Sequence, residues 1–203
     1  MFAILDMLLV GFVVGLTGAL VPGPMLFVTI DSSLKRGWVA GPQVFLGHAM
    51  IEFLVCLLII YGMTSFIGER EMSVISVVGG AVLIVFGVLT IKQARGACDE
   101  LHTHNEVITN PVSAGFLSSA SNPYFWVWWM AAGSALVLKG LEAGMLTVVF
   151  FMIGHWLADI GWFTAVSASF GRGRGLMSAG TYQKVLVSCG IFLIGFGAWF
   201  VVW

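Results

Sequence analysis

Two histidine–carboxylate pairs in the sequence combine side chains that are well suited to proton exchange. His48 and Glu52 lie four residues apart in "GHAMIE", and His155 and Asp159 lie four residues apart in "GHWLAD". Side chains at this spacing share one face of a helix, so each pair can hydrogen-bond and share a proton within its own helix. The duplicated pattern G-H-x-x-x-[D/E] predicts either proton coupling or a structural lock between two related segments.

Both pairs lie in apolar stretches, where a charged group is costly. The first is embedded in "VFLGHAMIEFLVCLLIIYG". An ionised carboxylate near the centre of a bilayer costs at least about 2.5 kcal/mol. We therefore expect all four side chains to face the interior of a helix bundle or a water-filled cavity.

The composition indicates an integral membrane protein. Of the 203 residues, 59% are hydrophobic and only 9% are charged, whereas an ordinary soluble domain carries roughly 25% charged residues. The net charge of -1 gives no indication of a nucleic-acid partner. The first residues, "MFAILDMLLV", lack a basic region and predict a first membrane helix rather than a cleaved signal peptide.

Six apolar segments are long enough to cross a bilayer, which takes about 20 residues. They lie at about 6–31, 38–69, 71–92, 107–138, 143–170 and 185–203. Seven of the nine Lys and Arg residues follow the first, third and fifth segments. Because basic loops remain in the cytoplasm, both termini are expected outside the cell membrane.

Similar motifs recur in the same order and predict an internal repeat. The third and sixth segments share "GAVLIVFG" (80–87) and "GIFLIGFG" (190–197), and the first and fourth share small residues before Pro22 and Pro123. We expect one all-α membrane domain, 1–203, formed by three-helix repeats at 1–95 and 107–203. A polar cytoplasmic loop at 96–106 separates them. Three spans per repeat would invert the second copy, as in many secondary transporters.

Helix breakers mark the first and fourth segments as discontinuous. Pro22, Gly23 and Pro24 interrupt the first segment, and Asn122 and Pro123 interrupt the fourth. Broken membrane helices expose backbone groups, which must be buried in protein or line a cavity. The N–H groups of a half-helix favour a carboxylate, and Asn122 can offer its amide, so the breaks predict a substrate site.

An aromatic run, "YFWVWW" (124–129), follows the second break. Its rings, among them Trp126, can form a cation–π site for a substrate amine. The alternative is that they serve as packing and lipid-facing bulk.

The loop "CDELHTHNE" contains residue types that bind transition metals, including His102 and His104. The spacing C-x3-H-x-H matches no familiar zinc site, so we expect a solvated loop, no bound metal and no cofactor. No nucleophile–base set or cofactor motif indicates an enzyme.

Three stretches resemble the LysE-type (lysine exporter) translocators: "TGALVPGPMLFVTIDSSLKRGWVAGPQVFLGH", "GGAVLIVFGVLTI" and "SNPYFWVWW". The resemblance covers nearly the whole chain. It implies secondary-active export of amino acids or related small metabolites, driven by a proton or ion gradient. Pro22, Gly23, Pro24, Asn122 and Pro123 match the motif. The expected partners are the small-molecule substrate, the lipid bilayer and, as an open option, further copies of the chain.

Departures from that pattern leave the cargo open. Tyr124 stands where many members have lysine after Asn-Pro, so lysine is not assumed as the substrate. The wider superfamily includes heavy-metal exporters of similar size, some with histidine-bearing central loops. Export of a divalent heavy-metal cation is therefore the alternative function.

Overall fold

The computed structural model describes residues 2–20, 23–62, 69–96, 110–173 and 178–202, and these residues are almost entirely helical, with no strand among them. In chain order the elements are α1 (Phe2–Ala19), α2 (Pro24–Arg36), the 3-10 turn η1 (Gly37–Val39), α3 (Ala40–Ile60), α4 (Glu69–Gly96), α5 (Pro111–Ala120), α6 (Pro123–Trp128), the π-helical segment η3 (Trp129–Gly133), α7 (Ser134–Glu142), α8 (Met145–Gly173) and α9 (Ala179–Val202).

Three stretches in the described chain are both long and apolar enough to cross a membrane: Pro24–Ile60, which joins α2, η1 and α3, Met145–Gly173 and Gln183–Val202. Shorter apolar helices cover Ile4–Ala19 and Gly80–Lys92. The prediction of an all-helical, multi-pass membrane protein is confirmed at this level. The arrangement of six spans stays a prediction.

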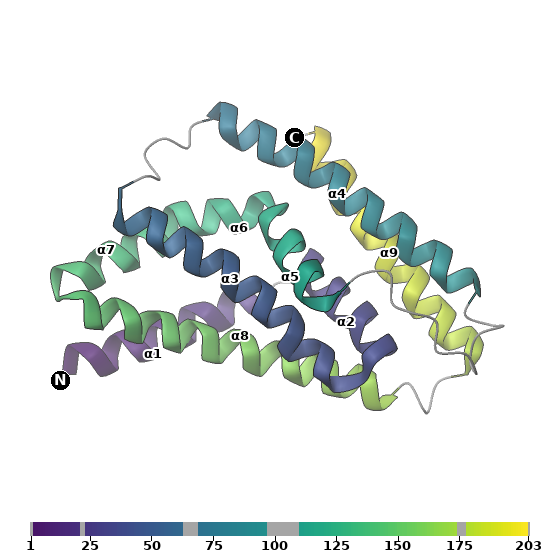
Figure 1. The fold of residues 1–203 in the computed structure, drawn as a ribbon, viewed down its shortest axis with the longest axis horizontal. Helices are drawn as coiled ribbons and strands as arrows, with labels where there is room; N and C mark the ends of the chain where they lie inside the picture. Colours follow the sequence, from purple (N-terminus) through teal and green to yellow (C-terminus); the bar gives the residue numbers. More distant parts are fainter. Residues whose placement is uncertain (1, 21–22, 63–68, 97–109, 174–177, 203) are drawn as a thin grey trace.

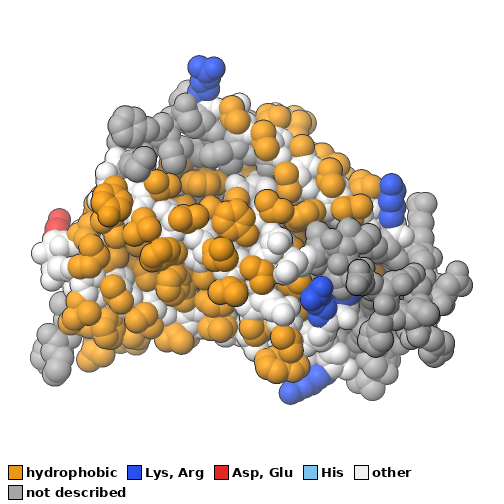
Figure 2. Space-filling model, in the orientation of Figure 1, with side chains coloured by type: hydrophobic (Ala, Val, Ile, Leu, Met, Phe, Trp, Pro, Cys, Tyr) orange, Lys and Arg blue, Asp and Glu red, His pale blue; other side chains and the backbone are white. Residues whose placement is uncertain are grey.

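The outer surface suits contact with lipid. Apolar side chains cover much of the face in Figure 2, and most of the Lys and Arg side chains visible on it lie near its edge. Large apolar residues are exposed on several helices, among them Leu9 on α1, Phe53 on α3 and Phe192 on α9. Exposed apolar side chains of this kind are characteristic of a protein solvated by acyl chains.

The chain leaves helical geometry at both breaks indicated by the sequence. α1 ends at Ala19 and α2 begins at Pro24, after Gly23 in an extended conformation. α5 ends at Ala120 and α6 begins at Pro123, after Asn122. Proline suits the first position of a helix because its missing N–H needs no partner there. Pro22 lies outside the described residues.

Glycines allow the principal helix pairs to approach closely. A Cβ atom on Gly154 of α8 would collide with the backbone of Leu8 in α1, and one on Gly47 of α3 would collide with Val112 in α5. α4 and α9 run side by side along one edge of the molecule (Figure 1), where Gly80 approaches the Gly197 carbonyl. Backbone contact of this kind is typical of membrane helix interfaces.

The corner between α2 and α3 is held by a side chain from α8. Gly37 has φ +75° and turns the chain between the two helices. The Gly41 N–H donates to Ser167 Oγ at 2.9 Å, and this hydroxyl lies 2.9 Å from the Trp38 carbonyl oxygen. One serine thus satisfies backbone groups of a corner that lies about 130 residues earlier in the chain.

Candidate functional site

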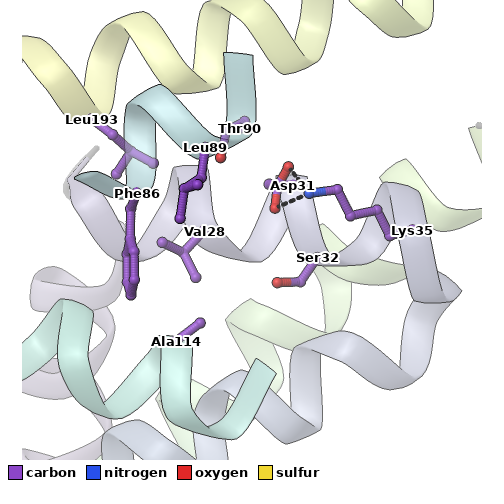
Figure 3. Close-up of a pocket in the computed structure, with 9 residues that line it drawn as sticks. All are labelled: Val28, Asp31, Ser32, Lys35, Phe86, Leu89, Thr90, Ala114 and Leu193. Atoms are coloured by element: carbon purple, nitrogen blue, oxygen red, sulfur yellow. Dashed lines mark hydrogen bonds and ion pairs between the residues drawn. The ribbon is translucent and has the colours of Figure 1, made fainter. Parts of the chain in front are cut away.

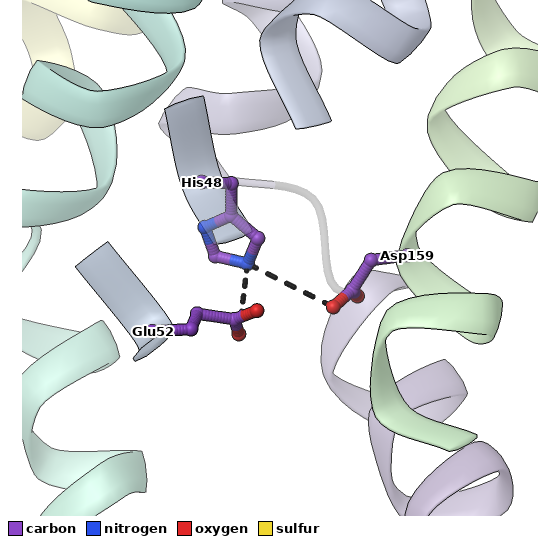
Figure 4. Close-up of side chains that lie close together, drawn as sticks. All are labelled: His48, Glu52 and Asp159. Carbon is purple, nitrogen blue, oxygen red and sulfur yellow. Dashed lines mark ion pairs between the residues drawn. The ribbon is translucent and has the colours of Figure 1, made fainter. Parts of the chain in front are cut away.

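The two predicted histidine–carboxylate pairs meet in one buried cluster where α3 contacts α8. His48 and Glu52 project from α3, and Asp159 reaches them from α8 (Figure 4). His155, one turn before Asp159 on α8, completes the cluster. Glu52 is 1% exposed and Asp159 is 2% exposed. The four side chains face the protein interior, as expected for ionisable groups in an apolar segment.

Glu52 lies at the centre of this cluster. Its Oε1 atom is 2.8 Å from His155 Nε2 and 3.1 Å from His48 Nε2. Asp159 Oδ2 is farther away, at 3.4 Å from His155 Nε2 and 4.0 Å from His48 Nε2. The shortest contact therefore joins the two helices, whereas the sequence spacing predicted pairs within each helix.

Trp156 hydrogen-bonds the second carboxylate oxygen of Glu52. Its indole Nε1–H donates to Glu52 Oε2 at 3.0 Å. Both oxygens of this buried carboxylate thus have partners, which offsets the cost of removing it from water. Asp159 Oδ2 makes no hydrogen bond with any described residue, so Asp159 is the less engaged of the two carboxylates.

Ser119 contacts the other side of the His48 ring. Its Oγ lies 2.7 Å from His48 Nδ1, donates to the Gly115 carbonyl at 2.8 Å, and lies 3.3 Å from Met25 Sδ. Met25 is in the first turn of α2 and Ser119 is in the last turn of α5. The helices that flank the two breaks therefore meet beside His48.

The Nδ1 atom of His155 has no partner among the described residues that is comparable to the Ser119 hydroxyl beside His48. Its Nδ1 atom is buried and makes no hydrogen bond among the described residues. Gly15 of α1 faces this atom, and a Cβ there would lie 2.7 Å from it. Aromatic rings enclose the imidazole instead, with the Trp128 and Trp129 centroids 5.1 and 5.5 Å away. Trp129 begins the π-helical segment η3, and such segments frequently occur at functional sites.

The other predicted substrate-site residues are engaged with their own chain. Asn122 accepts a hydrogen bond from the Tyr124 N–H through its side-chain oxygen and so caps α6. The Trp126 Nε1–H donates to the Ala120 carbonyl at 2.8 Å and thereby bridges the second break. Gly23, Pro24 and Pro123 form the starts of α2 and α6.

Sequence reasoning did not identify Ser119 or Trp156 as members of the site. Ser119 stands among small residues before a break, where the sequence offers no signal of a histidine partner 71 positions away. Trp156 follows His155 directly, and its position one residue on gives no reason to expect a contact with α3. Only the packing of α3 against α5 and α8 brings these groups together.

The same cluster has a spacing that a divalent cation would also fit. One ligand-type atom from each of His48, Glu52 and Asp159 lies within 4.8 Å of the others. The Glu52 contacts to the two imidazoles have hydrogen-bond lengths, so these side chains bind one another directly. The histidines of the central loop, His102 and His104, lie outside the described residues.

The chain is similar over most of its length to several known proteins. It is 24% identical over 195 residues to the candidate amino acid efflux protein YcgF of Bacillus subtilis, which covers 93% of this chain and 91% of that protein. It is 27% identical over 170 residues to the uncharacterized membrane protein YahN of Escherichia coli, covering 81% and 74%. It is 26% identical over 177 residues to the chemotactic transduction protein ChpE of Pseudomonas aeruginosa, covering 86% and 87%.

No solved structure matches this chain. The family model of the LysE type translocators matches residues 16–202, which include both breaks and all four residues of the buried cluster. This match, together with the apolar helices, indicates a multi-pass membrane exporter rather than an enzyme. The chain belongs to the LysE type translocator family.

Proposed function

We propose that this protein is a proton-coupled exporter of amino acids or closely related small metabolites. The observation that carries the proposal is the buried cluster, in which two carboxylates lie within 4.0 Å of two imidazoles contributed by two helices. Such a group can take up and release a proton without leaving an isolated charge in the membrane. The relationship to a candidate amino acid efflux protein supports amino acids as the cargo.

The proposal includes two inverted three-helix repeats, at 1–95 and 107–203. Reciprocal contacts support it. Gly47 in α3 abuts the backbone of α5, and Gly154 in α8 abuts the backbone of α1. Gly80 of α4 approaches the Gly197 carbonyl of α9, and Gly190 of α9 approaches the Gly87 carbonyl of α4. Exchanging the halves maps each contact onto another, which is the pattern of an approximate two-fold axis.

The breaks provide a path for the substrate in this proposal. Pro22, Gly23 and Pro24 would interrupt the chain so that the Gly23 N–H and the first N–H groups of α2 face a substrate carboxylate. Asn122 and Trp126 would maintain the shape of the second break, because their side chains hydrogen-bond the chain itself, and Pro123 would fix the start of α6. Movement at either break would reach His48 through the contact between Met25 and Ser119.

Transport by proteoliposomes tests the coupling. We expect Glu52→Gln combined with Asp159→Asn to abolish amino acid flux driven by a pH gradient, because neither amide can carry a proton. Exchange of labelled for unlabelled substrate at equal pH should persist, since it needs no net proton movement. Glu142→Gln, at the exposed end of α7, is the matched control. Undiminished pH-driven flux in the double variant would disprove the coupling role.

Export of a divalent metal cation is the second candidate function, and the 4.8 Å grouping of His48, Glu52 and Asp159 favours it. The same vesicles discriminate the two when they are loaded with Zn²⁺ or Mn²⁺ instead of amino acids. We expect no metal flux above that of metal-loaded vesicles that lack the protein. Metal flux without amino acid flux would establish the second function and reject the first.

A further inference from the structure

We propose that Glu52 and Asp159 alternate as the carboxylate that holds the two imidazoles of the buried cluster, and that Trp156 is the positioning residue that sets the balance between the two arrangements. The inference rests on the proposed coupling and on the proposed inverted repeats, and it adds a second state of the cluster. In the structure, Glu52 occupies the central position. In the second state, Asp159 takes that position.

The walls of the cluster are built twice, once from each half of the chain. A Cβ added to a glycine of one helix would meet a carbonyl oxygen of the facing helix in four matching cases, namely Gly47 with Val112, Gly154 with Leu8, Gly115 with Val44 and Gly11 with Phe151. Exchange of α1 with α5 and of α3 with α8, at one constant shift for each pair of helices, turns each of these contacts into another of them. The same exchange replaces His48 by His155 and Glu52 by Asp159.

The distances within the cluster depart from this equivalence between the helices. Within α3, His48 Nε2 lies 3.1 Å from Glu52 Oε1, and the equivalent distance within α8 is similar, at 3.4 Å. Between the helices, Glu52 Oε1 lies 2.8 Å from His155 Nε2. The equivalent distance from Asp159 Oδ2 to His48 Nε2 is 4.0 Å (Figure 4). The cluster is therefore displaced toward one of two equivalent arrangements.

The opposite displacement defines the second state. Because the two halves are inverted relative to each other, reversing their difference gives a similar structure that faces the other side of the membrane. There Asp159 Oδ2 approaches His48 Nε2 to hydrogen-bonding distance, and the contact between Glu52 and His155 opens. A closure of roughly 1 Å suffices, which is comparable to the helix shifts of many switching transitions. His155 keeps an acceptor, because Asp159 lies one turn away on its own helix.

Asp159 has an unused capacity for hydrogen bonding that the second state fills. The residue is almost fully buried, and its Oδ2 atom makes no hydrogen bond with any described residue. A buried carboxylate oxygen without a donor is costly. The second state therefore recovers at Asp159 much of the free energy that it gives up at Glu52. Two states of similar free energy are what an alternating cycle requires.

Trp156 shifts this balance in favour of Glu52. Its Nε1–H donates to Glu52 Oε2 at 3.0 Å. The equivalent position beside the other histidine is Ala49, whose methyl group can donate no hydrogen bond to Asp159. The described arrangement thus has one hydrogen bond to a carboxylate that the second arrangement lacks. Removal of this bond brings the two states closer in free energy.

Distances between spin labels on α3 and α8 test the exchange. In a chain whose native cysteines are replaced by alanine, the labels are placed on two pairs of exposed positions, Leu46 with Leu157 and Met50 with Ile153. Exchange of the halves turns one pair into the other. Electron–electron double resonance in proteoliposomes should give two different distances in Asp159→Asn, which retains the Glu52 carboxylate. The two pairs should exchange these distances in Glu52→Gln, which retains Asp159. The same distance for either pair in both variants would overturn the exchange.

Trp156→Phe tests the balance in a chain that retains both carboxylates. We expect the population of the second set of distances, relative to the first, to rise about tenfold, because the lost hydrogen bond ends on a charged group. Trp162→Phe should leave this ratio unchanged, since its indole N–H has no partner among the described residues. A purely structural Trp156 would lower the melting temperature and leave the ratio unchanged, and that result would reject its positioning role.

Failure of the exchange and failure of the proposed function are distinguishable. If the distances exchange between the two variants but the wild type shows no pH-driven flux, the two states stand and the coupling is wrong. If the wild type shows pH-driven flux that the double carboxylate variant loses, while the distances do not exchange, the coupling stands and the alternation is rejected.

Discussion

At the scale of single residues, the two histidines of the cluster differ on the side that faces away from Glu52. The Ser119 hydroxyl can accept a hydrogen bond from a protonated His48 Nδ1 while it donates to the Gly115 carbonyl, or rotate and donate to an unprotonated Nδ1 instead. His155 Nδ1 faces Gly15, which offers neither. A buried N–H without an acceptor is costly. We infer that His48 changes protonation during transport, while His155 remains a donor to a carboxylate of the cluster.

Ser119→Ala tests this assignment. The variant leaves the charged form of His48 with a buried Nδ1–H and no acceptor, so protonation requires a higher proton concentration. We expect the pH of half-maximal flux to become more acidic by about one unit, which corresponds to about 1.4 kcal/mol. Flux measured against pH in proteoliposomes provides the check, and Ser119→Thr should restore the original profile.

The neighbouring Ser118 is the control for that experiment. Its side chain is fully buried, and its hydroxyl makes no hydrogen bond among the described residues. Ser118→Ala should leave the profile unchanged. An unshifted profile in Ser119→Ala would refute the special role of His48.

Trp156→Phe isolates the second contact of Glu52. It removes the Nε1–H that binds Oε2 and leaves a buried carboxylate oxygen without a donor. We expect a loss of about 1–3 kcal/mol in stability, measured by thermal unfolding in detergent. Trp162→Phe, on the same helix, is the counterpart, because its indole N–H has no described partner to lose. Similar melting of the two variants would mean that the Trp156 hydrogen bond contributes little.

At the scale of helices, the sequence predicted the points where the chain breaks but not which helices pair. Pro24 and Pro123 mark helix starts because of local steric effects, and such effects can be predicted from the sequence alone. The pairing of α1 with α8 depends on shape complementarity at Gly154, over a separation of more than 100 residues. Glycine content alone does not encode the partner.

Gly154→Ala tests the closeness of this pairing. The new Cβ meets the backbone of Leu8, which cannot move aside as a flexible side chain would. We expect destabilisation of about 1–3 kcal/mol, seen as a lower melting temperature. Gly161→Ala is the comparison, since no atom lies within 4 Å of its added Cβ. It should be neutral or slightly stabilising because alanine favours helix. Equal melting of both variants would argue against tight contact.

At the scale of the whole molecule, the basic loops give an orientation that labelling can verify. In a chain with Cys56, Cys98 and Cys189 replaced by alanine, single cysteines can be placed at exposed ends of helices. We expect Tyr61→Cys to react with a membrane-impermeant maleimide in intact cells, and Ser178→Cys to react only after lysis. The reverse pattern would invert the assignment, and equal labelling would contradict an odd number of spans between the two positions.

The buried histidine–carboxylate cluster shows which contacts can be predicted from the sequence and which cannot. Spacing placed His48 with Glu52 and His155 with Asp159, because four residues make about one helical turn. It did not predict that Glu52 binds His155 more closely than it binds His48, since periodicity describes a single helix and not its neighbour. The small pocket lined by Asp31, Leu89, Ala114 and Leu193 (Figure 3) is a further case, because α2, α4, α5 and α9 must assemble before it exists.

The serine that holds the corner between α2 and α3 has a consequence for biogenesis. Ribosomes deliver the N-terminal helices to the membrane well before Ser167 is synthesised. Until α8 arrives, the Gly41 N–H lacks the acceptor that it has in the finished protein. Buried backbone groups need partners, so the early hairpin must wait near the membrane surface or rely on water. The first half of the chain is therefore expected to complete its packing only after translation, once Ser167 of α8 can accept the Gly41 N–H.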